Sequence, residues 1–345
     1  MKIRMFFKIP SRLLFSRLGL IAVLLGGILI PISGRGDDLT DCMMEMMPQA
    51  DDKMTIGELR LQCQEKLRQG PLAEESKPPA ALSERLRQDK ENVHQPFTLM
   101  SHKPNYLLLA AHNTSGYNPE PYREQDDDPS LDVNDTEVQF QISIKTPLAV
   151  DLFDLFDIYA AYTNHSFWQL YDSDSSPFRE TNHEPEAWVQ FQPNWEFLGL
   201  TNTVNAIGFV HQSNGRGGSL SRSWNRIYAN MVIEKGPFAM SFKPWYRIPE
   251  DDEDDDNPDI TDYMGHYELR AAYKWGENVF SAMSRNNLES GFSRGAVELT
   301  WSFPLGNYPF LKGYVQYFNG YGESLIDYNN YVNKIGIGFA LTDWF

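Results

Sequence analysis

Three residues in one short stretch have the types and spacing that a hydrolytic site needs. His211 and Ser213 are two residues apart, and Asn225 follows a segment rich in glycine and serine. In a β-hairpin centred near Gly218, His211 lies directly across from Asn225, and directly opposed side chains are close enough to touch. In such a trio the serine attacks, the imidazole takes its proton, and the amide oxygen orients the imidazole. The stretch therefore predicts a Ser–His–Asn hydrolase.

The strands of this hairpin must present all three side chains on one face. Ile207 and Phe209 precede the histidine and the serine at the same odd positions, and Asn225 is followed by odd-numbered apolar residues from 227 to 233. In a membrane barrel the apolar face is the one that meets lipid. The nucleophile is therefore predicted to face lipid, and a lipid is the expected substrate.

Period-2 alternation of apolar and polar residues runs through the chain from residue 97 to the end. Each candidate strand has about 10–17 residues, which is long enough to cross a bilayer at a tilt. The twelve predicted strands are 97–113, 135–149, 154–170, 184–195, 201–213, 221–236, 238–248, 261–276, 278–289, 295–306, 308–323 and 332–345.

The connections between these strands alternate in length. Long polar segments at 114–134, 171–183 and 249–260 alternate with turns of a few residues, as in a bacterial outer-membrane barrel. We therefore predict an all-β fold, a twelve-stranded antiparallel transmembrane β-barrel of the outer membrane. The competing fold is a soluble exported β-sandwich, which explains strand length and loop asymmetry less well.

The N-terminal part of the chain has a different character. Residues 1–34 combine a basic start with a short apolar run and are predicted to be a signal peptide. Residues 35–96 are predicted to be a polar periplasmic extension, and residues 97–345 the barrel. Cys42 and Cys63 both lie in the extension, where an oxidising compartment would allow one bridge between them.

The overall composition excludes one class of partner. The chain has 345 residues and a formal net charge of -17. Binding of nucleic acid phosphates depends on an excess of Lys and Arg, so no nucleic acid partner is expected. Aromatic residues make up 13% of the chain, and such residues are frequent in strands.

The candidate hairpin resembles a known one. Residues 211–225 read HQSNGRGGSLSRSWN and are similar to the active-site hairpin of the outer membrane phospholipase A family. Four further segments, 162–186, 243–246, 255–265 and 319–329, resemble the same family. The resemblance spans the predicted barrel.

The resemblance implies calcium-dependent hydrolysis of the sn-1 and sn-2 acyl esters of phospholipids and lysophospholipids. It implies that His211, Ser213 and Asn225 are the catalytic residues and that two membrane-embedded barrels pair through their lipid-facing sides when active. One calcium ion (Ca2+) would then bind per active site at the interface of this homodimer. Its ligands would be Ser221, Arg216 through its backbone carbonyl, and a serine of the other subunit. That serine is Ser175, with Ser176 as the alternative. The hairpin turn is predicted to lie at the extracellular rim, which puts the site in the outer leaflet half. An even number of strands returns both ends of the barrel to the periplasmic side, so the N-terminus is expected in the periplasm.

Two other functions fit a barrel of this size. A small porin or structural barrel needs no nucleophile, and its lumen would be narrow. An outer-membrane protease would use acidic and histidine side chains at the barrel mouth. Hydrolysis of phospholipid by the purified protein would favour the hydrolase. A steady open-channel conductance would favour the porin, and cleavage of basic peptides the protease.

Some further features have plainer interpretations. Ser293 matches a G-x-S-x-G pattern but falls in a predicted hairpin loop, where the required strand–turn–helix elbow is missing. The seven carboxylates of 250–256 are interpreted as a solvated external loop, with a dedicated calcium site as the alternative. The tryptophans near strand ends are assigned to interfacial aromatic girdles. They are Trp188, Trp195, Trp224, Trp245, Trp275, Trp301 and Trp344.

Overall fold

The computed structural model describes residues 80–93, 95, 97–173, 175–251 and 253–345, together with Met46, Thr55, Gly57, Arg60, Gln62 and Cys63. The chain divides into two compact units, residues 1–76 and residues 77–345. The predicted signal peptide and Cys42 lie outside the described residues, so cleavage and the Cys42–Cys63 bridge stay predictions. Among the described helices, none is long and apolar enough to cross a membrane.

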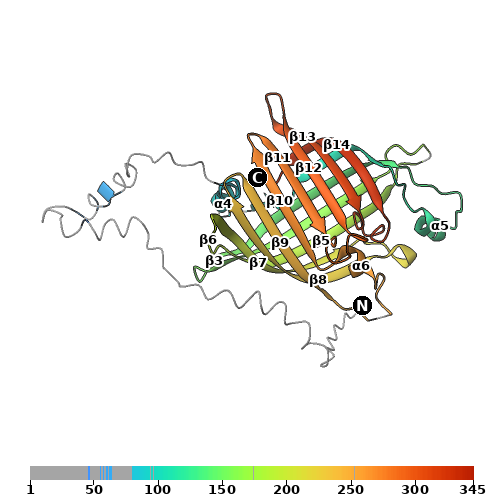
Figure 1. The fold of residues 1–345 in the computed structure, drawn as a ribbon, viewed down its shortest axis with the longest axis horizontal. Helices are drawn as coiled ribbons and strands as arrows, with labels where there is room; N and C mark the ends of the chain where they lie inside the picture. Colours follow the sequence, from blue (N-terminus) through green and yellow to red (C-terminus); the bar gives the residue numbers. More distant parts are fainter. Residues whose placement is uncertain are drawn as a thin grey trace. The chain divides into compact units, whose positions relative to one another are not determined.

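Within the described part of the chain, twelve long strands form one closed antiparallel barrel, which confirms the predicted fold class (Figure 1). Strands that follow one another pair in order, and β14 pairs with β2 to close the sheet. Two short strands, β1 (Met100–Ser101) and β6 (Trp195–Phe197), add to β3 and β7. The barrel strands are β2 (Asn105–Asn113), β3 (Thr136–Leu152), β4 (Phe156–Trp168), β5 (Phe178–Phe191), β7 (Leu200–Ser213), β8 (Ser223–Lys235), β9 (Phe238–Ile248), β10 (Tyr267–Trp275), β11 (Asn278–Arg285), β12 (Ala296–Leu305), β13 (Tyr308–Gly320) and β14 (Val332–Thr342).

The two ends of the barrel differ in their connections, as the sequence predicts. Short turns such as 236–237 and 276–277 join strands at one end, which we call the short-turn end. Segments such as 114–135 and 249–266 join them at the other, the long-loop end. The long loops contain α5 (Glu120–Asp126), η2 (Gly218–Leu220) and α6 (Ile260–Met264).

One strand begins earlier than predicted. β5 starts at Phe178 rather than near residue 184, so the loop before it shortens to residues 169–177. Arg179 and Glu180, at the start of this strand, are both buried. Because the barrel interior accepts charged side chains, apolar alternation does not mark this part of the strand.

Another predicted strand begins as a helix. Residues Ile260–Met264 form α6, and β10 starts only at Tyr267. Ile260 and Met264 are four residues apart, so one helical face brings both into the same buried cluster. Gly265 then ends the helix at a φ of +64°, a conformation that favours glycine.

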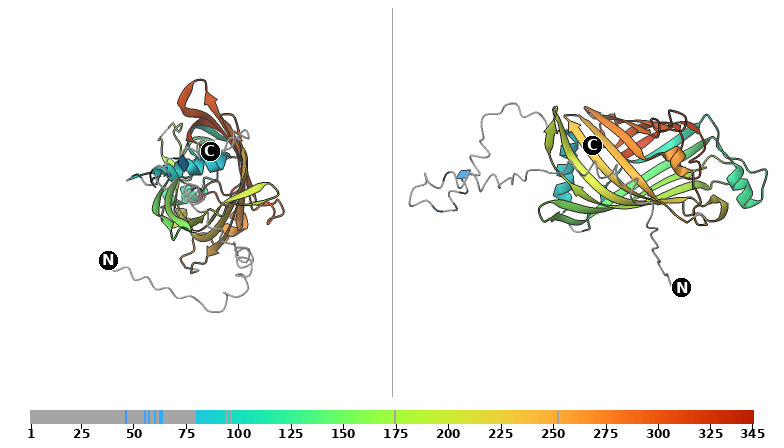
Figure 2. Two further views of the ribbon diagram at one scale, coloured as in Figure 1. Left: turned by 90° about the vertical axis from the view of Figure 1, so that its left-hand side faces the viewer. Right: turned by 60° about the horizontal axis from the view of Figure 1, so that its bottom comes forward.

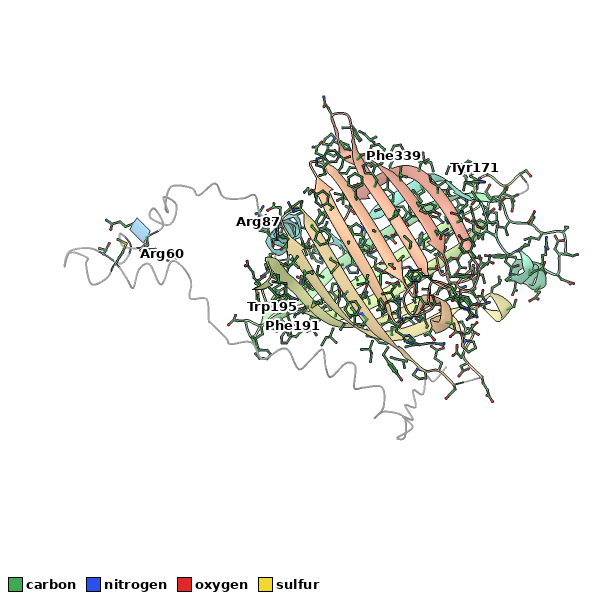
Figure 3. The ribbon with its side chains drawn as sticks, in the orientation of Figure 1. Arg60, Arg87, Tyr171, Phe191, Trp195 and Phe339 are labelled. Carbon is green, nitrogen blue, oxygen red and sulfur yellow. The ribbon has the colours of Figure 1, made fainter. Side chains whose placement is uncertain are left out.

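The outward surface of the barrel is apolar. Ile207 and Phe209 of β7 are 43% and 45% exposed there. Figure 3 shows Phe191 and Trp195 near the short-turn end and Tyr171 near the long-loop end, and all three side chains are exposed. Exposed aromatic residues at both margins of an apolar band are typical of a lipid-facing barrel.

Side chains fill the interior of the barrel. Trp188, Trp224 and Trp245 are buried there, so their assignment to an interfacial girdle is wrong. They sit on the inward face because side chains alternate along a strand and their sequence neighbours point outward. Trp224 finds a polar partner inside, donating its Nε1–H to Gln212 Oε1 at 2.9 Å.

Helix α4 (Ala81–Asn92) lies across the short-turn end (Figure 2). The Ala81 N–H donates to the Gly236 carbonyl at 2.9 Å, and Lys145 Nζ pairs with Asp89 at 2.6 Å. The last part of the predicted extension 35–96 therefore packs on the barrel. The functional division at residues 34 and 96 stays a prediction.

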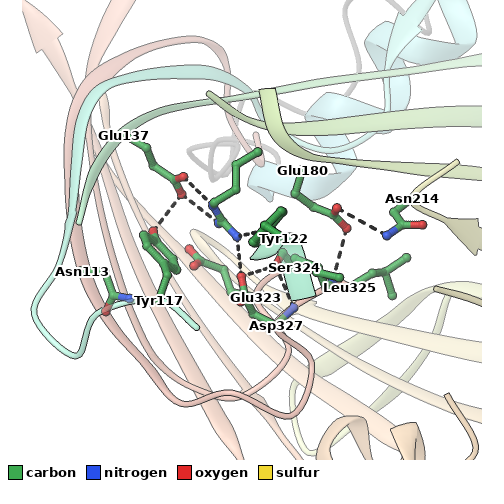
Figure 4. Close-up of polar contacts among 12 residues, drawn as sticks. Asn113, Tyr117, Tyr122, Glu137, Glu180, Asn214, Glu323, Ser324, Leu325 and Asp327 are labelled. Atoms are coloured by element: carbon green, nitrogen blue, oxygen red, sulfur yellow. Dashed lines mark hydrogen bonds and ion pairs between the residues drawn. The ribbon is translucent and has the colours of Figure 1, made fainter. Parts of the chain in front are cut away.

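Buried charges tie the long loops to the barrel wall. Arg179 of β5 donates to Glu137 Oε2 of β3 at 2.9 Å and to Asp327 Oδ2 at 2.6 Å (Figure 4). The side chains of all three are no more than 4% exposed. Tyr117 donates to Glu137, Tyr122 accepts from Arg179, and burial raises the pKa of both hydroxyls. These contacts join the loops 114–135 and 321–331 to strands β3 and β5.

A glycine in β7 makes room for two large interior aromatic residues. Gly208 pairs with Trp188 on one side and Tyr228 on the other. A Cβ atom at this position would lie 2.5 Å from Tyr228 Cζ and 2.8 Å from Trp188 Cβ. Gly208→Ala is therefore expected to lower the free energy of unfolding by about 1–3 kcal/mol through overpacking. Thermal unfolding in detergent, followed by the heat-modifiable mobility of the barrel, measures this.

Gly217→Ala is the matched control for this substitution. Its φ of -119° suits any residue, and a Cβ atom there has open space. Unfolding of both variants at the wild-type temperature would contradict the packing role of Gly208.

Candidate active site

The β7–β8 hairpin brings the three predicted catalytic residues onto one surface. Its register pairs His211 with Asn225 and Ser213 with Ser223, as the count from the turn predicts. Phe209, two residues before the histidine, points outward on the same face. The three polar side chains therefore lie at the long-loop end of an apolar outer surface.

Two hydrogen bonds define the geometry of these residues. His211 Nδ1 lies 2.9 Å from Asn225 Oδ1, and because an amide oxygen only accepts, Nδ1 carries the proton. Ser213 Oγ accepts a hydrogen bond from the Gly215 N–H at 3.0 Å. With the proton on Nδ1, Nε2 is the nitrogen with the basic lone pair. In this tautomer the imidazole can accept a proton from a serine hydroxyl.

The loop that follows the serine is held in shape by its own polar groups. Asn214 donates to the Leu220 carbonyl at 2.7 Å and accepts from the Arg222 N–H at 3.0 Å. The Arg216 guanidinium donates to the carbonyls of Phe178 and Arg179, at 2.9 and 2.7 Å. The hairpin loop is thereby attached to the start of β5.

The predicted calcium ligands come from two separate loops. Ser221 and Arg216 share the hairpin loop, whereas Ser175 lies in the loop 169–177, where its N–H donates to Asp172 Oδ1 at 3.2 Å. The Ser221 hydroxyl donates to Asp256 Oδ2. Among the described residues no group of three or more His, Cys, Asp or Glu side chains is placed to hold a metal. The hydroxyl, carbonyl and carboxylate oxygens around Ser221 nevertheless suit calcium, which prefers oxygen ligands.

The acidic loop after β9 approaches the same site. Asn225 Nδ2 donates to Glu250 Oε1 at 2.9 Å, and Arg247 pairs with Asp255 Oδ1 at 2.6 Å. Burial raises the pKa of Glu250, and the hydrogen bond from Asn225 opposes this rise. Within the loop 250–256, interpreted as solvated, Glu250 and Asp255 are therefore only partly exposed, and both side chains contact the barrel strands. Extending the register count from β8 to β9 could have found Glu250, because Asn225 pairs with Ile248.

One protein-family model matches most of this chain. It is described as phospholipase A1 and matches residues 82–341. The chain belongs to the phospholipase A1 family. Since phospholipase A1 is an ester hydrolase, membership favours the enzyme over the porin alternative.

Relatives in this family are similar over most of their length. Phospholipase A1 of Klebsiella pneumoniae is 40% identical over 262 residues, which make up 75% of this chain and 87% of the relative. Outer membrane phospholipase A of Escherichia coli has a TM-score of 0.66 and 39% identity, covering 72% of this chain and 100% of its own. The outer membrane phospholipase of Salmonella typhi, a dimer with bound calcium, has a TM-score of 0.65 and 38% identity, covering 73% and 95%.

Proposed function

We propose that this chain is a calcium-dependent phospholipase of the bacterial outer membrane, active as a homodimer. It hydrolyses the sn-1 and sn-2 acyl esters of phospholipids and lysophospholipids. Its site lies in the outer leaflet half of the membrane, with the N-terminus in the periplasm. Membership in the phospholipase A1 family and the outer-membrane relative from Escherichia coli support this proposal.

One observation carries the catalytic part of the proposal. The hydrogen-bonded pair His211–Asn225 lies beside Ser213 on the outer surface, next to the exposed side chains of Phe209 and Ile227. A soluble substrate would have to cross lipid to reach this place. A phospholipid in the same leaflet presents its acyl ester there directly.

The reaction follows from the roles of the three side chains. His211 Nε2 takes the proton of Ser213 as Oγ attacks the acyl carbonyl carbon, and then gives this proton to the departing glycerol oxygen. Water, activated by the same imidazole, hydrolyses the acyl-enzyme. Asn225 holds the ring in the required tautomer. The Gly215 N–H, 3.0 Å from Ser213 Oγ, is close enough to donate to the oxyanion.

Calcium is proposed to bind beside the nucleophile through oxygen ligands. These are the Ser221 hydroxyl, the Arg216 carbonyl and Ser175 of the partner subunit, with Ser176 as the alternative. Bound there, the ion supplies positive charge that stabilises the oxyanion. Ser175 lies in the loop 169–177, apart in the chain from the hairpin loop that carries Arg216 and Ser221, and we propose that it reaches the ion from the partner subunit. The calcium-bound dimer from Salmonella typhi supports this arrangement.

Removal of calcium tests this function. We expect EDTA to lower hydrolysis of phospholipid in mixed micelles by about 10²-fold, the usual cost of losing one oxyanion-stabilising group. Added calcium should restore the activity and magnesium should not, because magnesium demands a small octahedral site. Phospholipids whose acyl chains are labelled separately at sn-1 and sn-2 show which ester bond is hydrolysed. Activity that is indifferent to EDTA would refute the calcium requirement.

A further inference from the structure

The acidic loop places a carboxylate directly behind the amide of the proposed triad. Across three strands, His211 of β7 pairs with Asn225 of β8, and Asn225 pairs with Ile248 of β9. Glu250 is two residues beyond Ile248, so it continues on the same outer face. Its Oε1 accepts the Asn225 Nδ2–H at 2.9 Å.

This contact settles which way the Asn225 amide faces. An amide alone can turn either its oxygen or its nitrogen toward the imidazole, and only the oxygen accepts from Nδ1–H. An ionised carboxylate has acceptors only, so Glu250 selects the orientation in which Nδ2 points to it and Oδ1 points to His211. The negative charge also polarises the amide and strengthens its oxygen as an acceptor.

We propose that Glu250 is a positioning residue for the hydrolysis reaction, acting through Asn225 to hold and stabilise the His211 imidazolium. The inference rests on the proposed function. The Asn225 amide is neutral and adds no charge of its own. The negative charge comes from Glu250, which is one hydrogen bond further from His211. The four side chains then form the relay Ser213–His211–Asn225–Glu250.

The charges around Glu250 leave its carboxylate directed toward the relay. Arg247, at the end of β9, is already paired with Asp255 at 2.6 Å. Burial and Asp255 raise the pKa of Glu250, whereas Asn225, Arg247 and His211 lower it.

The substitution Glu250→Gln tests the role in the native background. We expect kcat to fall about tenfold, because glutamine carries no charge and can turn either its oxygen or its nitrogen toward Asn225, so a charge-assisted hydrogen bond becomes a neutral one. KM is unchanged because Glu250 does not touch substrate. The acidic limb of the kcat/KM profile should move to lower pH, because the imidazolium loses a stabilising charge. Glu253→Gln, at an exposed position of the same loop, is the matched control and should leave kcat and the profile unchanged.

A double substitution gives a sharper test. Asn225→Asp alone puts two carboxylates in contact, which should lower kcat by repulsion and misplaced protonation. Adding Glu250→Gln to that variant supplies an amide that donates to the new carboxylate, so kcat should rise about tenfold. The same Glu250→Gln change therefore lowers kcat in one background and raises it in the other.

If Glu250 only stabilised the fold, Glu250→Gln would change kcat in the same direction in both backgrounds. An equal loss in both backgrounds, or no change in the native one, would overturn the inference. Heat-modifiable mobility checks that every variant is folded. Ser213→Ala in the same assay separates the two claims: if it stays active, the proposed function fails, and if it is inactive while Glu250→Gln is normal, only this inference fails.

Discussion

Replacing Ser213 with alanine is expected to reduce acyl-ester hydrolysis to background, a loss of about 10⁴-fold or more. Loss of the nucleophile in a serine hydrolase removes the acyl-enzyme route entirely, and little remains beyond binding and oxyanion stabilisation. The side chain lies at the end of β7 on the outer surface and accepts only a backbone hydrogen bond from Gly215 among its described contacts. Its removal should therefore leave the barrel folded.

Ser293→Ala is the control for this prediction. Ser293 lies in the loop 286–295 and donates to the Ser290 carbonyl at 2.7 Å, far along the chain from the β7–β8 hairpin. It matches a nucleophile pattern in sequence but has no place in the relay, so the variant should hydrolyse phospholipid at the wild-type rate. Substantial activity in a purified Ser213→Ala protein, after a contaminating lipase is excluded, would remove Ser213 from its role.

Replacing Arg179 with methionine is expected to lower the free energy of unfolding by about 3–5 kcal/mol. The guanidinium holds two carboxylates, those of Glu137 and Asp327, in a site that excludes water. Methionine fills much of the space but carries no charge. Glu137 keeps Lys334 at 3.4 Å, whereas Asp327 loses its cation, and an uncompensated buried charge is costly. Thermal unfolding of the detergent-solubilised barrel measures the loss.

Arg87→Met is the matched control for Arg179. Arg87 lies on α4, pairs with Glu84 and Glu91 and is 57% exposed, so solvent screens its charge. The same chemical change there should leave the unfolding temperature unchanged. If Arg179→Met unfolds like the wild-type protein, the ion pairs at the long-loop end do not stabilise the barrel.

The β7–β8 hairpin was predictable because its information is local. Side chains alternate with a period of two along a strand, and the length of a turn sets which residues oppose each other. His211 and Asn225 are therefore paired by residues within one short segment. The strand count follows for the same reason, since each strand and turn carries its own pattern.

Contacts that depend on barrel closure and on folded loops were not predictable in this way. Glu137 and Asp327 meet Arg179 across sequence separations of 42 and 148 residues, and no local period links them. The polar start of β5 was missed because its side chains enter a charged interior. The inward tryptophans were misassigned because position near a strand end does not reveal which face of the strand a residue occupies.

The sequence by itself determined the class of fold, the outward face of the hairpin and the residues that could do chemistry. Only the tertiary structure decided which side chains from other elements contact these residues. Glu250 reaches Asn225 because β9 lies beside β8 and Glu250 follows two residues after Ile248, the β9 partner of Asn225. Local pattern specifies pairing within a hairpin, whereas a loop's position depends on the free energy of contacts with elements distant in the chain, and those neighbours exist only once the barrel has closed.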